Sequence, residues 1–92
     1  MKFALILLKT RTINFHLSEA IGCIVILDQT DQAIRVVGGS EEIPLSARHG
    51  YRGDALSEAY NSGIKTALAH GVPHDAIQRL AWDDSTGQYV PF

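Results

Sequence analysis

The spacing of the hydrophobic residues changes halfway along the chain, and this change limits the possible folds more than any other feature. Between residues 2 and 37 apolar positions alternate with polar ones or form short runs, as in β-strands. From residue 54 they recur every three or four positions, as in α-helices. Strands followed by helices are typical of an α+β fold. The chain has 92 residues, so we expect a single domain, residues 1–92, with one modest core.

Three to four short strands are predicted within residues 2–37. Residues 2–8 are apolar on both faces, and "RTINFHL" places Ile13, Phe15 and Leu17 on the buried face of a half-buried strand. "CIVILD" is apolar on both faces, which is typical of a central strand. The turn "DQTDQ" lets "AIRVV" run back as part of a hairpin. Together these segments predict a small, mainly antiparallel sheet.

A long helix over residues 54–71 and a short helix over 73–82 are predicted to pack on one face of this sheet. Asp54 suits the N-cap of the long helix, Gly71 suits its left-handed end, and Pro73 opens the next helix. The long helix carries a ridge of large apolar residues beside a ridge of small ones, which permits close approach to the sheet. The large ridge is Leu56, Tyr60, Ile64 and Leu68, and the small ridge is Ala55, Ala59, Gly63 and Ala67.

The glycine-containing segment 38–53 is predicted to be a long loop, and it holds the candidate site. Long loops in compact domains are uncommon unless they bind something or move. "ARHGYRGD" places Arg48, His49, Tyr51 and Arg52 directly before a helix N-terminus. Two guanidiniums, an aromatic ring and the helix dipole suit a phosphate, a nucleotide or an acidic partner segment. The alternative is a solvated loop whose arginines pair with nearby carboxylates.

A helix-turn-helix DNA-binding regulator is an alternative function suggested by "LAHGVPHDAIQRLAWDD", residues 68–84. The break at Gly71 and Pro73 between two apolar-spaced segments resembles such a motif in one dimension. However, "HDAIQRLAWDD" has one arginine against three aspartates, and carboxylates repel the phosphate backbone. The formal net charge of −2 adds no general attraction to nucleic acid. Charge therefore argues against DNA as a partner.

A small enzyme using His49 or His74 is the second alternative. A concave pocket that brings His49 together with a carboxylate would favour it. We expect no metal and no cofactor, because Gly71 and Pro73 separate His70 from His74 and no cysteine pair exists. The single cysteine, Cys23, is expected to be a buried thiol. The apolar start is too short for a signal peptide or a membrane span, so we expect a cytoplasmic protein with no membrane partner.

Residues 11–82 resemble the C-terminal domain of adenosylcobalamin-dependent ribonucleotide reductases and its small stand-alone relatives, the TSCPD domains. The matching segments are "RTINFHL", "GCIVIL" and above all "ALSEAYNSGIKTALAHGVPHDAIQRLAW", which is similar to that family's long helix, Gly-Val-Pro turn and short helix. The cysteines of several family members are absent here, so no zinc role transfers. The resemblance implies an α+β accessory module connected with nucleotide metabolism and carries over no catalytic residue.

These observations predict a small non-catalytic accessory or interaction module, and the resemblance links it to ribonucleotide reductase or nucleotide metabolism. Residues 2–8 and the apolar tail 88–92, which contains Tyr89, Val90 and Phe92, favour docking on the body or on a partner. A two-fold homodimer is the simplest such arrangement.

Overall fold

The computed structural model describes residues 1–29, 34–36 and 43–92. Its strands are β1 (Lys2–Asn14), β2 (Leu17–Gln29), β3 (Ile34–Val36), β4 (Ile43–His49), β5 (Ile77–Asp83) and β6 (Gln88–Pro91). One α-helix, α1 (Arg52–Ala69), and one 3₁₀ turn, η1 (His74–Ala76), complete the described part of the chain. No helix among these residues is long and apolar enough to cross a membrane.

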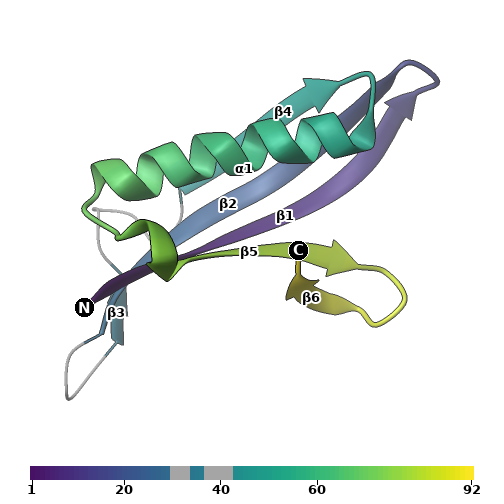
Figure 1. Cartoon of the computed structure of the whole chain (residues 1–92). Helices are drawn as coiled ribbons and strands as arrows, with labels where there is room; N and C mark the ends of the chain where they lie inside the picture. The colour runs from purple at the N-terminus through teal and green to yellow at the C-terminus, as the bar shows by residue number, and fades with distance from the viewer. Residues whose placement is uncertain (30–33, 37–42) are drawn as a thin grey trace.

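All the described strands belong to one mainly antiparallel sheet with β1 and β2 at its centre. The strand order is β3-β2-β1-β5-β6, and β4 also pairs with β2. β3 and β4 share one edge of β2 at different ends: β3 pairs with residues 27–29 and β4 with residues 18–24. β5 runs parallel to β1, and the other pairs are antiparallel. α1 lies across one face of the sheet and connects β4 to β5 (Figure 1).

The predicted α+β class and mainly antiparallel sheet are confirmed, but the short helix predicted over 73–82 is wrong. Only His74–Ala76 form a 3₁₀ turn, and residues 77–83 form β5. The apolar residues Ile77, Leu80 and Ala81 fit either structure by spacing alone. The free edge of β1 decides between them, because pairing with residues 4–8 satisfies backbone groups that an isolated two-turn helix would satisfy poorly. In the described part of the chain the sheet therefore has six strands rather than the predicted three to four.

Two further predictions about strands are corrected. β1 extends to Asn14 and the chain turns at Phe15 and His16, so "RTINFHL" is a strand end, a turn and a strand start. Phe15 is 102% exposed at the hairpin tip instead of buried. The predicted loop 38–53 contains β4 over residues 43–49, and α1 begins at Arg52. Residues 38–42 of that loop, and 30–32 of the "DQTDQ" turn, lie outside the described residues.

The hydrophobic core lies between α1 and the sheet face that it covers. Along β1 the fully buried residues are Ala4, Ile6 and Leu8, and their partners Ile26 and Ile24 on β2 are buried with them. From α1 the core takes Ala55, Leu56, Ala59, Tyr60 and Ala67. The small ridge predicted from the sequence thus packs on the sheet. A Cβ added at Gly63 would stand 2.9 Å from Ile6 Cδ1 and 3.0 Å from Leu45 Cδ1, so alanine fits there only if the ends of these two side chains move.

Tyr60 anchors the helix to β5 and to the end of the chain. Its hydroxyl donates to the Leu80 carbonyl at 2.6 Å, and its ring stacks on Phe92 with centroids 4.9 Å apart. Burial raises the pKa of Tyr60 to about 12, against an opposing effect of the Arg79 charge. The end of the predicted apolar tail therefore docks on the body of the protein.

The ends of α1 agree partly with prediction. Gly71 has φ +83° directly after the C-cap His70, as predicted for a left-handed helix end. The N-cap is Tyr51, which makes no side-chain capping bond, and Asp54 lies in the first turn instead. There its negative charge still favours the positive end of the helix dipole.

Candidate functional site

Strand alternation separates the four residues proposed as one site. Arg48 and His49 are the last two residues of β4, Tyr51 caps α1, and Arg52 is its first residue. Consecutive side chains of a strand point to opposite faces, so Arg48 lies on the sheet face away from α1 and His49 on the helix side. The structure therefore places these residues in different surroundings rather than in one cluster.

Arg48 belongs to a row of charges across three strands, which we call the arginine row: Arg11 on β1, Glu19 on β2 and Arg48 on β4. Arg11 pairs in register with Glu19, and Glu19 with Arg48. Arg11 Nε and Nη2 both lie 2.7 Å from Glu19 Oε1, and Arg48 Nε donates to Glu19 Oε2 at 2.7 Å. Glu19 is 5% exposed, whereas both arginines are more than half exposed.

The two arginines keep Glu19 ionised. The hydrogen bond from Arg48 is the largest influence and lowers the pKa of Glu19; desolvation opposes it and Arg11 adds to it, so the pKa lies below its ordinary value. The row as a whole carries one net positive charge. Alternating opposite charges across neighbouring strands stabilise a sheet, and here they also hold two guanidiniums in fixed places.

His49 lies in a hollow of about 580 Å³ beside α1. Its Nδ1 is 3.6 Å from Asp54 Oδ2, and the two side chains are 48% and 57% exposed. The other lining residues are Glu58, Asn61, Ser62 and Lys65. This arrangement meets the condition under which the sequence favoured an enzyme, a hollow that brings His49 together with a carboxylate. The pair is separated by more than a good hydrogen-bond length and lies open to water.

Tyr51 and Arg52 do not line that hollow. Tyr51 is 75% exposed. Arg52 lines a smaller polar hollow of about 220 Å³ with Asp84 and the hydroxyl residues Thr10, Thr12 and Ser18. Because a carboxylate faces the guanidinium across this hollow, it suits a neutral polar group better than an anion.

The two histidines considered for metal binding, His70 and His74, have different surroundings. His70 Nδ1 lies 2.8 Å from the Thr66 carbonyl oxygen, and His74 begins η1 on the far side of Gly71. Among the residues that the structure describes, no group of three histidine, cysteine, aspartate or glutamate side chains is arranged to hold a metal ion.

The strands that the sequence predicts to be apolar on both faces also form the sheet face opposite α1, which we call the open face. Its apolar members on β1 and β2 are Phe3, Leu5, Leu7, Ile21, Cys23, Val25 and Leu27, which pair in register with one another or with Lys9. None of them belongs to the core under α1. Within residues 1–29, 34–36 and 43–92, every other strand joins the same sheet and α1 lies on the other side, so no element covers this face.

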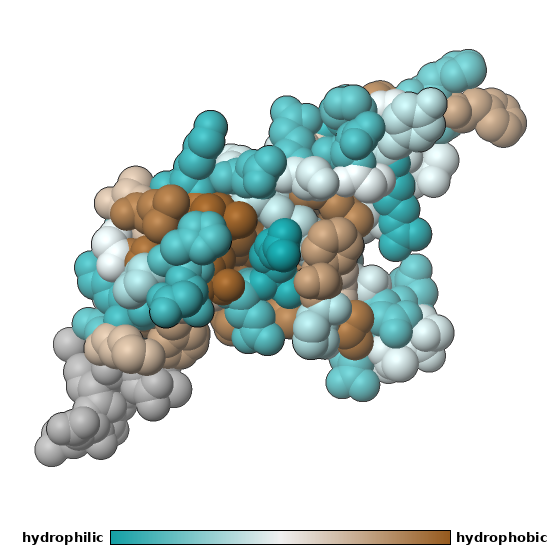
Figure 2. All heavy atoms as spheres, in the orientation of Figure 1, coloured by the Kyte–Doolittle hydropathy of each residue, from teal (hydrophilic) through white to brown (hydrophobic). Residues whose placement is uncertain are grey.

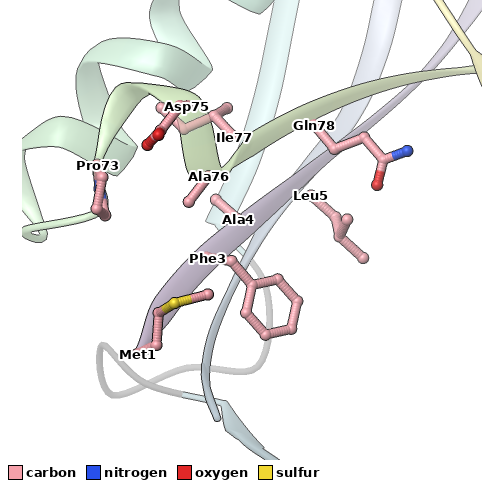
Figure 3. A pocket seen from close by; sticks show the side chains of 9 residues that line it. All are labelled: Met1, Phe3, Ala4, Leu5, Pro73, Asp75, Ala76, Ile77 and Gln78. Carbon is pink, nitrogen blue, oxygen red and sulfur yellow. The ribbon is translucent and has the colours of Figure 1, made fainter.

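One end of the open face is hollowed where β5 begins. Phe3 and Leu5 point away from the side on which Ala4 meets Ala76 and Ile77 (Figure 3). A hollow of about 560 Å³ lies at this end, where the sheet edge meets η1, and residues from both sides of the sheet line it: Met1, Phe3, Ala4, Leu5, Pro73, Asp75, Ala76, Ile77 and Gln78. At the other end Lys9 Nζ lies 4.2 Å from the ring centroid of Trp82, which packs edge-on against Tyr89. The open face thus runs from an apolar end to a basic end at the arginine row.

The helix side presents a different surface. Polar side chains cover most of α1, and a hydrophobic area lies toward its C-terminal end (Figure 2). Leu68, which is 46% exposed, lies on this part of the helix.

Comparison with known proteins gives no relative. No family model, no curated protein and no solved structure matches this chain. The short helix that forms part of the TSCPD resemblance is a strand in this structure.

Proposed function

We propose that this chain is a non-catalytic interaction module that associates with a second copy of itself through the open face. The observation that carries the proposal is that β1 and β2 are apolar on both faces, while α1 covers only one. A solvated sheet face normally alternates polar side chains with the apolar ones of the core face. Contiguous apolar surface of this kind marks interaction sites in soluble proteins.

The size of the open face suits a dimer. At ~4.8 Å per strand and ~3.3 Å per residue, the run from Phe3 to Arg11 on β1, its partners on β2 and the shorter β4, β5 and β6 beside them have a projected area on the order of 600 Å². This is of the same order as the ~800 Å² of accessible surface that each partner of a stable complex buries.

A second copy fits this face because apolar side chains are complementary to themselves. In a two-fold dimer the same patch serves both subunits and both patches are buried at once. The basic end sets the orientation: a two-fold axis across the strands separates the two copies of Lys9, Arg11 and Arg48. An axis along the strands would bring these like charges together.

A matched pair of leucine variants tests the proposal. Leu5→Lys places a charge on the apolar part of the open face, and Leu68→Lys places the same charge on the C-terminal part of α1. We expect wild type and Leu68→Lys to have twice the mass of one chain by light scattering at micromolar concentration, and Leu5→Lys to have the mass of one. A monomeric wild type, or a Leu68→Lys variant that alone dissociates, overturns the proposal.

The structure bears differently on the two other functions suggested by the sequence, a role in nucleotide metabolism and DNA binding. A role beside ribonucleotide reductase is implied by the sequence resemblance alone, and the strand at 77–83 removes one of its elements. The helix-turn-helix alternative required a recognition helix over 73–82, but His74–Ala76 form only a 3₁₀ turn and the residues from Ile77 belong to β5. We therefore keep the ribonucleotide reductase link as a sequence-based proposal and set the DNA-binding alternative aside.

A second candidate function is a small acid–base enzyme at the His49–Asp54 pair. It is supported by the hollow in which Ser62 and Lys65 accompany the pair. Hydrolysis of a p-nitrophenyl ester, measured for His49→Ala and for the exposed control His16→Ala, tests it. A loss of turnover in His49→Ala alone supports an enzyme, and equal rates in both variants and wild type overturn it.

A further inference from the structure

The outer edge of β4 offers backbone groups for pairing. β4 pairs with β2 on one side, and no other described strand pairs with it. Pro44 has no N–H to donate, and proline is accommodated in a paired strand when its nitrogen faces the free edge. Successive residues of a strand point their N–H and C=O groups to opposite edges, so those of Ser46 and Arg48 face the same edge as the nitrogen of Pro44.

The arginine row ends at this edge. Across the strands the charges alternate as Arg11, Glu19 and Arg48, each in register with the next. Arg48 uses Nε for Glu19, and its side chain is 59% exposed. The next position outward, one strand spacing from Arg48, therefore favours a negative charge.

We propose that the free edge of β4 binds an extended segment of a partner protein whose acidic side chain lies opposite Arg48 and forms the fourth member of the row. The segment would pair with the backbone of Ser46 and Arg48, as in recognition by strand addition. Its carboxylate would accept from the guanidinium of Arg48, which Glu19 already holds in place. The preorganised arginine reduces the side-chain entropy lost on binding.

A second copy of β4 does not satisfy this site. The segment Ile43–His49 contains no aspartate or glutamate, so a copy paired edge to edge cannot supply the fourth charge. A nucleic acid is also a poor match, because the row carries a single net positive charge and the chain as a whole has a formal charge of −2. One carboxylate on a strand fits the charge that is available.

The test uses two short blocked peptides of alternating threonine and valine, one with a central glutamate and the other with glutamine in its place. Binding is followed by amide chemical shifts of ¹⁵N-labelled protein. We expect the glutamate peptide to shift Ser46 and Arg48 and to bind about tenfold more tightly than its twin. Arg48→Gln is expected to remove this preference, whereas Arg52→Gln, a nearby arginine outside the row, keeps it.

A backbone variant tests strand addition itself. Ser46→Pro removes an N–H from the free edge at a place where proline fits, as Pro44 does, and we expect it to lose both peptides with an unchanged circular dichroism spectrum. Should Ser46→Pro unfold, Arg48→Gln still decides the proposal. Equal binding of the two peptides, a preference that survives Arg48→Gln, no shift at Ser46 and Arg48 at millimolar peptide, or a shift by single-stranded oligonucleotide alone each overturns it. Repeating the titration with Leu5→Lys separates this site from the dimer, because β4 does not need the second copy.

Discussion

The two faces of one sheet are both apolar, yet they are used differently. On the helix side, Ala4, Ile6 and Leu8 of β1 are fully buried against a ridge of small residues on α1. On the open face, Leu5 and Leu7 of the same strand remain partly exposed. The first face is completed within the chain, and on our account the second is completed by another copy. An uninterrupted apolar strand can thus be buried on one side by its own chain and, on our account, on the other side by a second copy.

The largest expected effect compares the neighbours Leu8 and Leu7. Leu8→Ala leaves a cavity in the core and should lower the free energy of unfolding by about 3 kcal/mol at any protein concentration. Leu7→Ala should cost about 1 kcal/mol in dilute protein, where its surroundings are partly solvated. In concentrated protein its cost should grow, because dissociation of the dimer is then linked to unfolding.

Urea unfolding at two protein concentrations measures both effects. Ser62→Ala, on the outer side of α1, serves as a control that changes neither face. If Leu7→Ala costs the same at both concentrations, the distinction between the two faces fails.

An intermediate effect is expected at Gly63, where α1 touches the covered face. Alanine improves helix propensity by about 1 kcal/mol, but its Cβ would meet Ile6 and Leu45 side chains at 2.9 and 3.0 Å. Overpacking of a core costs about 1–3 kcal/mol, so Gly63→Ala should be destabilising by about 1 kcal/mol. Gly53→Ala, in the first turn with nothing within 4 Å, should be neutral or stabilising in the same thermal unfolding assay. Two variants that shift the midpoint equally would show that helix packing is looser than described.

The smallest effect concerns acid stability at the basic end of the open face. The pKa of Glu19 is lower in the folded chain than its ordinary value of 4.5. The arginine row therefore contributes stability above that value, which is lost as the pH falls through the folded pKa. We expect the urea midpoint of wild type to fall more steeply than that of Glu19→Gln as the pH drops below 4.5. Parallel curves would mean that the row does not stabilise the folded state.

The packing of the covered face could be predicted from the sequence more completely than the use of the open face. The small ridge of α1 and the left-handed Gly71 follow from spacing and glycine chemistry, and the structure confirms them. Of the predicted large ridge, Leu56 and Tyr60 are buried, whereas Leu68 is 46% exposed. The flanking glycines and the proline predict a loop where the structure has β4. The strand pattern is nevertheless present, since Ile43, Leu45 and Ala47 alternate with Pro44, Ser46 and Arg48. The apolar residues of β5 fit both the helix spacing and the strand spacing, so the sequence alone predicts a helix there. Pairing with the neighbouring edge of β1 is what selects the strand.

The candidate site could likewise be predicted only in part from the sequence. "ARHGYRGD" does contain the arginine that matters to our proposal, but residues adjacent in sequence alternate faces once they lie on a strand. Arg11 and Glu19, the in-register partners that define the row, are far from Arg48 in the sequence. Their pairing depends on the register of the β1–β2 hairpin, which the turn at Phe15 and His16 sets.

The most direct measurement of the central claim is an isotope-filtered nuclear Overhauser experiment on a mixture of labelled and unlabelled chains, which detects only contacts between copies. The account predicts contacts between copies from the methyl groups of Leu5, Leu7 and Val25 on the open face. The account would be contradicted if contacts between copies came only from Leu68 and Ile64 on α1. It would also be contradicted if no such contacts were found and light scattering gave the mass of a single chain.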